Sequence, residues 1–85
     1  MIEKEHKVPG GKLVRIRATI EEGTISTIEI HGDFFLHPEA TISAIEEALI
    51  GVRVEEVADT VRDTLEAHNA QLIGCSPQDI QRTLE

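Results

Sequence analysis

A run of alternating apolar and polar residues, residues 12 to 20, most constrains how this chain can fold. The apolar positions on one side of the run are Val14, Ile16, Ala18 and Ile20. Alternation with a period of two is typical of a half-buried strand. Glu21-Glu22-Gly23 follows as a turn, and residues 24 to 31 form a second strand with Ile28 and Ile30 facing inward. The sequence therefore predicts an antiparallel β-hairpin with one apolar face.

Helical patterns dominate the second half of the chain. The first predicted helix begins at Pro38-Glu39, carries a stripe of Ile42, Ile45 and Leu49, and ends before Gly51. The second helix spans residues 54 to 68, with apolar residues at helical spacing along one side. The third opens with Ser76-Pro77-Gln78-Asp79, the pattern of an N-cap, a first-turn proline and a capping box.

Two short apolar segments complete the expected architecture. Residues 34 to 36 and residues 72 to 73 are each long enough for a short strand at a sheet edge. The predicted fold is therefore α+β, with a small antiparallel sheet (the N-terminal hairpin plus short edge strands) packed by three helices. We expect residues 1–85 to form a single domain.

The composition narrows the environment of the chain. There is no Trp or Tyr, so aliphatic side chains must build the core of this 85-residue chain. The single cysteine, Cys75, excludes an internal disulfide and fits a reducing cytoplasm. No segment has the roughly 20 apolar residues of a membrane span, and the charged N-terminus is unlike a signal peptide. We therefore expect a cytoplasmic protein with no membrane partner.

Charge is distributed unevenly along the sequence. Residues 1 to 17 hold five Lys and Arg against two Glu, a balance of +3, whereas residues 18 to 85 hold three Arg against fourteen acids, a balance of −11. An acidic body without Tyr or Trp disfavours nucleic acid as a partner. The basic end is where an anionic ligand or an acidic partner surface would bind, or it is a solvated strand of mixed charge.

Two short motifs have both structural and functional interpretations. Pro9-Gly10-Gly11-Lys12 is either a plain β-turn, which is favoured, or a turn that binds phosphate through backbone N–H groups. In Gly32-Asp33-Phe34-Phe35, one phenylalanine enters the core and the other faces outward, or both are buried, which is slightly favoured. Asp33 is expected to cap its own turn, with a partner's arginine as the alternative.

Metal and nucleophile chemistry are weakly indicated. His31, Asp33 and His37 lie close in sequence, but there is no second cluster of ligands, so no metal site is expected. Cys75 precedes a predicted helix and could be a nucleophile, but a single cysteine is more often a small apolar core residue. We expect no catalytic residue in this chain.

The order of these segments resembles a known family. Lys7-Val-Pro-Gly-Gly-Lys-Leu-Val-Arg-Ile16, the hairpin, Ile30-His-Gly-Asp-Phe-Phe-Leu-His-Pro38 and a short helix closed by Leu49-Ile-Gly51 are similar to the accessory C-terminal domain of lipoate–protein ligases. The resemblance covers residues 7 to 84, and the chain starts at its own Met1. It implies the small, non-catalytic subunit of a two-chain ligase whose large subunit binds ATP, Mg and lipoate and makes lipoyl-adenylate.

The resemblance also implies partners and a location for the contact. The direct partner would be the large catalytic subunit, and the indirect partners would be acceptor lipoyl domains of 2-oxoacid dehydrogenases or the glycine cleavage H protein. The residues expected near the partner or its nucleotide are Lys7, Gly11, Lys12, Asp33, Phe34 and Phe35. The alternatives are a stand-alone binding or regulatory module for another acyltransferase and a small enzyme that uses Cys75 or the histidines.

Overall fold

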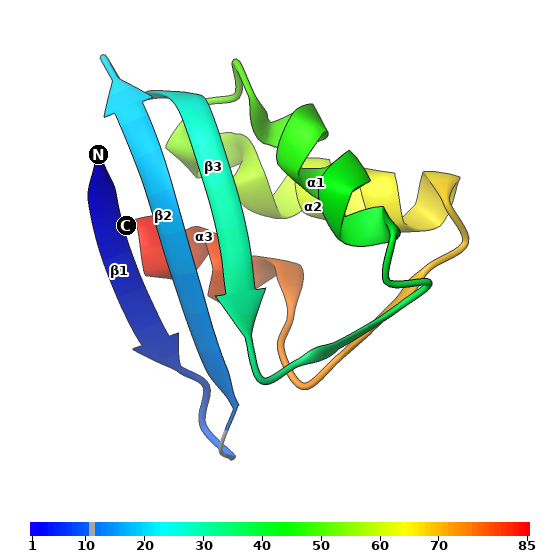
Figure 1. Ribbon diagram of the computed structural model, residues 1–85. Helices are drawn as coiled ribbons and strands as arrows, with labels where there is room; N and C mark the ends of the chain where they lie inside the picture. The colour runs from blue at the N-terminus through cyan, green and yellow to red at the C-terminus, as the bar shows by residue number, and fades with distance from the viewer. Residues whose placement is uncertain (11) are drawn as a thin grey trace.

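The computed structural model describes residues 1–10 and 12–85 and contains two small antiparallel sheets and three α-helices. Strands β1 (Ile2–Lys7), β2 (Leu13–Glu21) and β3 (Thr24–Gly32) form one sheet in that order. Helices α1 (Thr41–Leu49), α2 (Val57–Ala67) and α3 (Pro77–Leu84) all lie on one side of this sheet (Figure 1). The α+β fold predicted from the sequence is confirmed.

The predicted hairpin is present with the expected face inward. Val14 pairs with Gly32 and Ile16 with Ile30, and a turn at Glu22 and Gly23 joins the two strands. Both turn residues have positive φ, 52° and 80°, as the twist-matched turns of tight hairpins require. Val14, Ile16 and Ala18 are at most 1% exposed. The alternation in the sequence therefore identified the side of the sheet that packs on the helices.

Residues from all three helices complete a single apolar cluster beneath the sheet. The buried helical members of the cluster are Ile45 and Leu49 of α1, Val57 and Val61 of α2, and Ile80 and Leu84 of α3. Each pair is spaced by four residues, which places both side chains on one face of its helix. Burial of each such side chain contributes about 2 kcal/mol, so the three helix faces and the hairpin stabilise one another.

Strand β1 was not predicted. Its inward-facing positions include Lys4 and His6, which are polar and conceal the strand pattern. Both lie over α3, where the Lys4 ammonium donates to the carbonyl oxygen of Leu84 at 3.4 Å. An inward-pointing charge on an edge strand also discourages pairing with other chains. The strand forms because the last helix supplies polar partners that no local pattern reveals.

The boundaries of two predicted helices are wrong. Helix α1 begins at Thr41, because Pro38 and Glu39 form a preceding turn whose carbonyl groups accept from the N–H groups of Thr41 and Ile42. The His37–Pro38 peptide bond is cis. The expected helix over residues 54 to 68 is divided into a 3₁₀ turn, η1 (Val54–Glu56), and α2. Gly51 has φ of 86° and follows Ile50, the C-cap residue of α1, as the predicted helix end requires.

The two short strands form a ribbon of their own instead of extending the main sheet. Strand β4 (Phe35–His37) pairs antiparallel with β5 (Gln71–Ile73), and Phe35 lies opposite Ile73. The connections that contain them run side by side along the lower right of Figure 1, between the end of the sheet and the helices. Leu36 is buried, and Leu72 packs against the main core, so the inner face of the ribbon is anchored.

Gly32 is the glycine whose replacement tests this arrangement. A Cβ at this position would lie 2.2 Å from the carbonyl oxygen of Leu13, a contact that only backbone movement can relieve. We expect Gly32→Ala to lower the free energy of unfolding by about 3 kcal/mol, measured by urea denaturation. Gly51→Ala is the control, because a Cβ there meets nothing within 4 Å. It should lose only about 1 kcal/mol through its positive φ, and equal losses would contradict the predicted collision.

Candidate docking site at one end of the sheet

The residues selected from the sequence gather at one end of the molecule. Lys7 ends β1, Lys12 directly precedes β2, and Asp33 and Phe34 follow β3. Antiparallel pairing brings these ends together, because Lys7 lies opposite Leu13 and Val14 lies opposite Gly32. Gly11, the remaining residue of the predicted set, lies outside the described residues. The sheet register alone therefore places the two lysines beside the segment that leads into β4.

The two phenylalanines differ in solvent exposure. Phe34 is half-buried and packs against the apolar core, whereas Phe35 is 69% exposed. The slightly favoured expectation that both are buried is wrong. Phe35 belongs to β4, where it and buried Leu36 point to opposite faces of the ribbon. The chain therefore exposes one of its two aromatic side chains.

Lys12 and Phe35 are neighbours in space. The Lys12 ammonium lies 6.0 Å from the centroid of the Phe35 ring, at the outer limit of a cation–π contact. Gly74 allows this approach, because a Cβ on it would lie 3.0 Å from Cγ of Lys12 and 3.4 Å from Cα of Phe34. The site thus includes the end of β5, which the sequence did not select. The sequence did contain a signal for this part of the site, namely the predicted strand at 72–73 followed by a glycine. In a strand, Ile73 points to the opposite face from Leu72.

Asp33 makes its local contact through the backbone. Its N–H group donates to the carbonyl oxygen of Leu13 at 3.0 Å, and its side chain is exposed. This bond ties the segment after β3 to the start of β2. The turn is therefore fixed by a backbone interaction, and among the described residues no side-chain hydrogen bond of Asp33 accompanies it.

The two arginines of the basic end are already paired. Nε of Arg15 lies 2.9 Å from Oε1 of Glu5, and Arg17 lies 3.4 Å from Glu3 and 3.9 Å from Glu29. These pairs join neighbouring strands across the outer face of the sheet, where exposed ion pairs contribute about 1 kcal/mol or less each. Among the described residues, the ion pairs include neither Lys7 nor Lys12. The mixed-charge interpretation therefore fits the arginines, and the two lysines carry the local positive charge.

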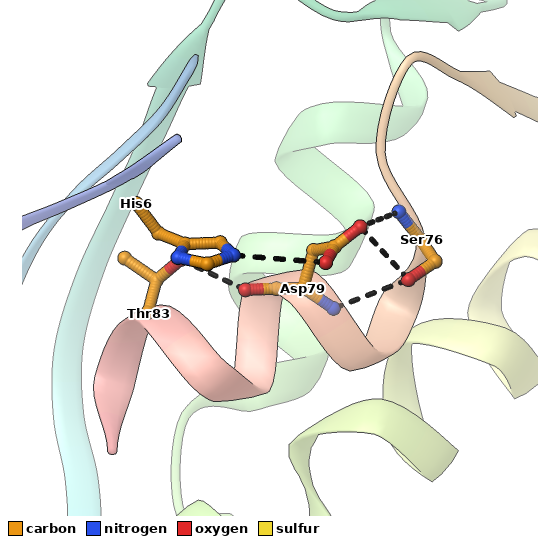
Figure 2. Close-up of polar contacts among 4 residues, drawn as sticks. All are labelled: His6, Ser76, Asp79 and Thr83. Carbon is orange, nitrogen blue, oxygen red and sulfur yellow. Dashed lines mark hydrogen bonds and ion pairs between the residues drawn. The ribbon is translucent and has the colours of Figure 1, made fainter. Parts of the chain in front are cut away.

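A second polar cluster, formed by His6, Ser76, Asp79 and Thr83, lies between β1 and α3 (Figure 2). The Asp79 carboxylate accepts from the N–H and hydroxyl groups of Ser76 at 2.8 and 3.0 Å, and the N–H of Asp79 donates back to that hydroxyl at 3.2 Å. This is the predicted capping box. Nε2 of His6 lies 3.8 Å from the carboxylate, an ion-pair distance and not a hydrogen bond. The cluster holds β1 on α3.

The structure does not assemble the suggested metal ligands. Within residues 1–10 and 12–85, no group of three His, Cys, Asp or Glu side chains is placed to hold a metal ion. His31 lies next to the last residue of β3, and His37 is the last residue of β4, with the turn at Asp33 between them.

Helices in the same described ranges are all too short or too polar to cross a membrane.

Cys75 is a packing residue in this fold. The thiol is half-buried against the apolar core, just before the capping box of α3. Burial, assisted by the negative charge of Asp79, raises its pKa to about 11. The thiol is therefore protonated at neutral pH, which disfavours the nucleophile interpretation. The pKa is raised, not lowered as a helix N-terminus alone would do, because burial and the charge of Asp79 both oppose ionisation.

Two of the surface grooves among the described residues bear on these features. The larger, about 610 Å³, lies between α1 and α2 and is lined by small and acidic residues: Ala44, Glu47, Ala48, Thr60, Asp63, Thr64, Ala67 and His68. The smaller, about 380 Å³, lies beside Phe35. Its lining residues come from the end of β3, from β4 and from the start of α1: Ile30, His31, Gly32, Phe34, Phe35, Leu36, Glu39 and Ile42. The sequence-selected end of the molecule thus combines an exposed ring, a hollow and two lysines.

The described residues define a small α+β domain with an exposed aromatic side chain beside a groove at one end of its sheet. The family model for the bacterial lipoate protein ligase C-terminus matches residues 1–84, and the chain belongs to this family. It is 34% identical over 86 residues to lipoate-protein ligase A subunit 2 of Thermoplasma acidophilum, with 99% of this chain and 87% of that protein covered. It is therefore homologous to the small subunit of a two-chain lipoate–protein ligase.

A solved structure agrees with this assignment. The chain matches a protein from the structure of a bi-partite lipoate protein ligase and its E2 lipoyl domain from Thermoplasma acidophilum, with a TM-score of 0.84. The sequence identity is 30%, and the match covers 100% of this chain and 94% of the other. The resemblance stated from the sequence is confirmed.

Thiol labelling tests the assignment of Cys75. At pH 7.5 the native thiol should react at least about 100-fold more slowly than in the urea-unfolded chain, where the pKa returns to about 8.5. Because the folded pKa is raised, the stability due to the buried thiol is complete below pH 8.5 and is lost as pH rises towards 11. The Cys75→Ser/Gln78→Cys variant supplies an exposed control thiol. Labelling of native Cys75 as fast as the control would contradict the assignment.

Proposed function

We propose that this chain is the non-catalytic small subunit of a two-chain lipoate–protein ligase. It binds a large catalytic subunit and enables that subunit to activate lipoate with ATP, forming lipoyl-adenylate. The observation that carries the proposal is the similarity of nearly the whole chain to a protein named as a ligase subunit. In this proposal, ATP, Mg and lipoate bind to the large subunit.

The acceptor is reached indirectly. The large subunit transfers the lipoyl group to a lysine of an acceptor lipoyl domain, of 2-oxoacid dehydrogenases or of the glycine cleavage H protein. Direct docking of an acidic acceptor on this chain is disfavoured, since residues 18 to 85 have a balance of −11. We place this reaction in the cytoplasm, where a single protonated cysteine is stable against disulfide formation.

The contact with the large subunit is proposed at the end of the sheet that carries Lys7 and Lys12, which we call the lysine end. Lys7, Lys12, Asp33, Phe34 and Phe35 lie there. In this proposal they face the partner or its bound nucleotide. Docking at this end would order the adenylation site of the large subunit, as an accessory domain does when it closes over a reaction centre. The paired arginines on the sheet face have a structural role in this proposal.

Lipoate-dependent ATP–pyrophosphate exchange tests the function directly. The large subunit, this chain and their mixture are assayed separately. We expect exchange chiefly in the mixture, and none from this chain alone. Equal exchange by the large subunit alone would remove this chain from adenylation and favour a stand-alone binding or regulatory module for another acyltransferase.

Charge neutralisation tests the proposed end of the sheet. Lys7→Gln/Lys12→Gln should weaken binding to the large subunit about tenfold at low salt, mainly through slower association, and less at 0.5 M salt. Arg15→Gln/Arg17→Gln removes the same charge from side chains that are already paired. Surface plasmon resonance on both variants measures the difference. Equal weakening by the two would show that net charge matters and position does not.

A further inference from the structure

The outer face of the β4–β5 ribbon presents two large apolar side chains side by side. Phe35 is 69% exposed, Ile73 is 57% exposed, and the two residues are directly opposite each other in the ribbon register. Opposite residues on one face of an antiparallel pair have Cβ atoms about 5 Å apart. The two side chains therefore form one continuous apolar surface, which we call the ribbon patch.

The ribbon patch is held rigidly from below. Buried Leu36 and half-buried Leu72 lie opposite each other on the inner face and pack against the main core. A two-stranded ribbon is marginal alone, so this anchoring fixes the outward pair. Phenylalanine has only two side-chain torsions, and its ordering on binding costs little entropy. The patch is therefore preorganised for binding in the free chain.

The residues around the ribbon patch are arranged as they are around the centre of a protein–protein interface. His37 and Gln71, the next outward pair along the ribbon, are polar and exposed. On the other side Lys12 lies 6.0 Å from the Phe35 ring centroid, and the groove of about 380 Å³ lies beside the same ring. An aromatic anchor with a neighbouring hollow and a polar rim is typical of hot spots at protein interfaces.

We propose that the ribbon patch is the apolar centre of the contact with the large ligase subunit, an inference that rests on the proposed function. The matching surface of the large subunit is an apolar recess for Phe35 and Ile73 with carboxylates on its rim. Those carboxylates meet Lys12, which already lies at the patch, and Lys7 at the neighbouring strand end. A side chain of the large subunit fills the groove beside Phe35.

Charge favours this occupant over a second copy of the chain. Each copy has a net charge of −8, so two copies repel each other. A twofold contact centred on Phe35 would also use the same surface on both sides and bring Lys12 towards its own counterpart. A large subunit with carboxylates at the contact has neither disadvantage. Its acids lie against the lysine end and away from the acidic body.

Truncation of the patch is the experiment that tests the inference. Phe35→Ala, Ile73→Thr and the double variant are titrated against the large subunit by calorimetry, with pyrophosphate exchange measured in parallel. Ile50→Thr is the matched control, because Ile50 is 55% exposed and caps α1 at the other end of the sheet, where the next residue, Gly51, donates to the carbonyl oxygen of Ile25. We expect about a 30-fold increase in Kd for the double variant and less than about twofold for the control.

Two further measurements separate binding from folding. The patch variants should keep the thermal midpoint of the wild-type chain within a few degrees, because both side chains are exposed. Phe35→Leu should restore most of the affinity lost in Phe35→Ala, since it returns apolar area without the ring.

The outcomes distinguish this inference from the function on which it rests. Wild-type stimulation of exchange together with unchanged affinity in the double variant would overturn the ribbon patch and leave the proposed function intact. Failure of the wild-type chain to bind or stimulate the large subunit would overturn both. Loss of self-association in the double variant, at unchanged affinity for the large subunit, would assign the patch to a second copy.

Discussion

The packing of the hairpin's apolar face against three helices is the interaction on which the rest of the structure depends. Val14, Ile16 and Ile30 supply the sheet side of this contact, and pairs of residues four apart supply each helix side. The chain has no Trp or Tyr, so the contact is made almost entirely by branched aliphatic side chains. Because every helix buries its stripe in the same cluster, no element is stable without the others. Most of the large apolar side chains are buried in this contact, and few are exposed on the surface.

The few large apolar side chains that remain exposed are therefore significant. Isolated exposed aliphatic residues are normal in proteins, and Ile50 is an example. Phe35 and Ile73 differ because they are paired in register and anchored from beneath by Leu36 and Leu72. The outer face of the main sheet is different again, since Arg15 and Arg17 join its strands to glutamates. One sheet face is thus saturated with ion pairs, and the ribbon supplies the apolar contact surface.

Sequence patterns predicted those parts of the fold that depend on local periodicity. The hairpin face, the helix stripes and the capping box at Ser76 and Asp79 all follow from residues close together in the chain. Strand β1 was missed because the partners of Lys4 and His6 lie on α3, near the other end of the chain. The start of α1 was placed too early because Pro38 and Glu39 also suit a turn. Of the candidate site, the sequence identified Lys12 and Phe35, whereas Ile73 depends on a strand pairing that only the structure reveals.

The contact between β1 and α3 also determines the order in which this chain can complete its fold. The hydrogen bond from Lys4 to Leu84 joins residues 80 positions apart, the largest separation among the side-chain hydrogen bonds of the described residues. During synthesis, the hairpin can pair as soon as Gly32 has emerged, but the polar inward side of β1 has no partner until the final helix follows. Long-range closure of this kind slows folding. The inner face of the N-terminal strand therefore stays uncovered until α3 has been synthesised, and its lysine and histidine keep that face polar in the meantime.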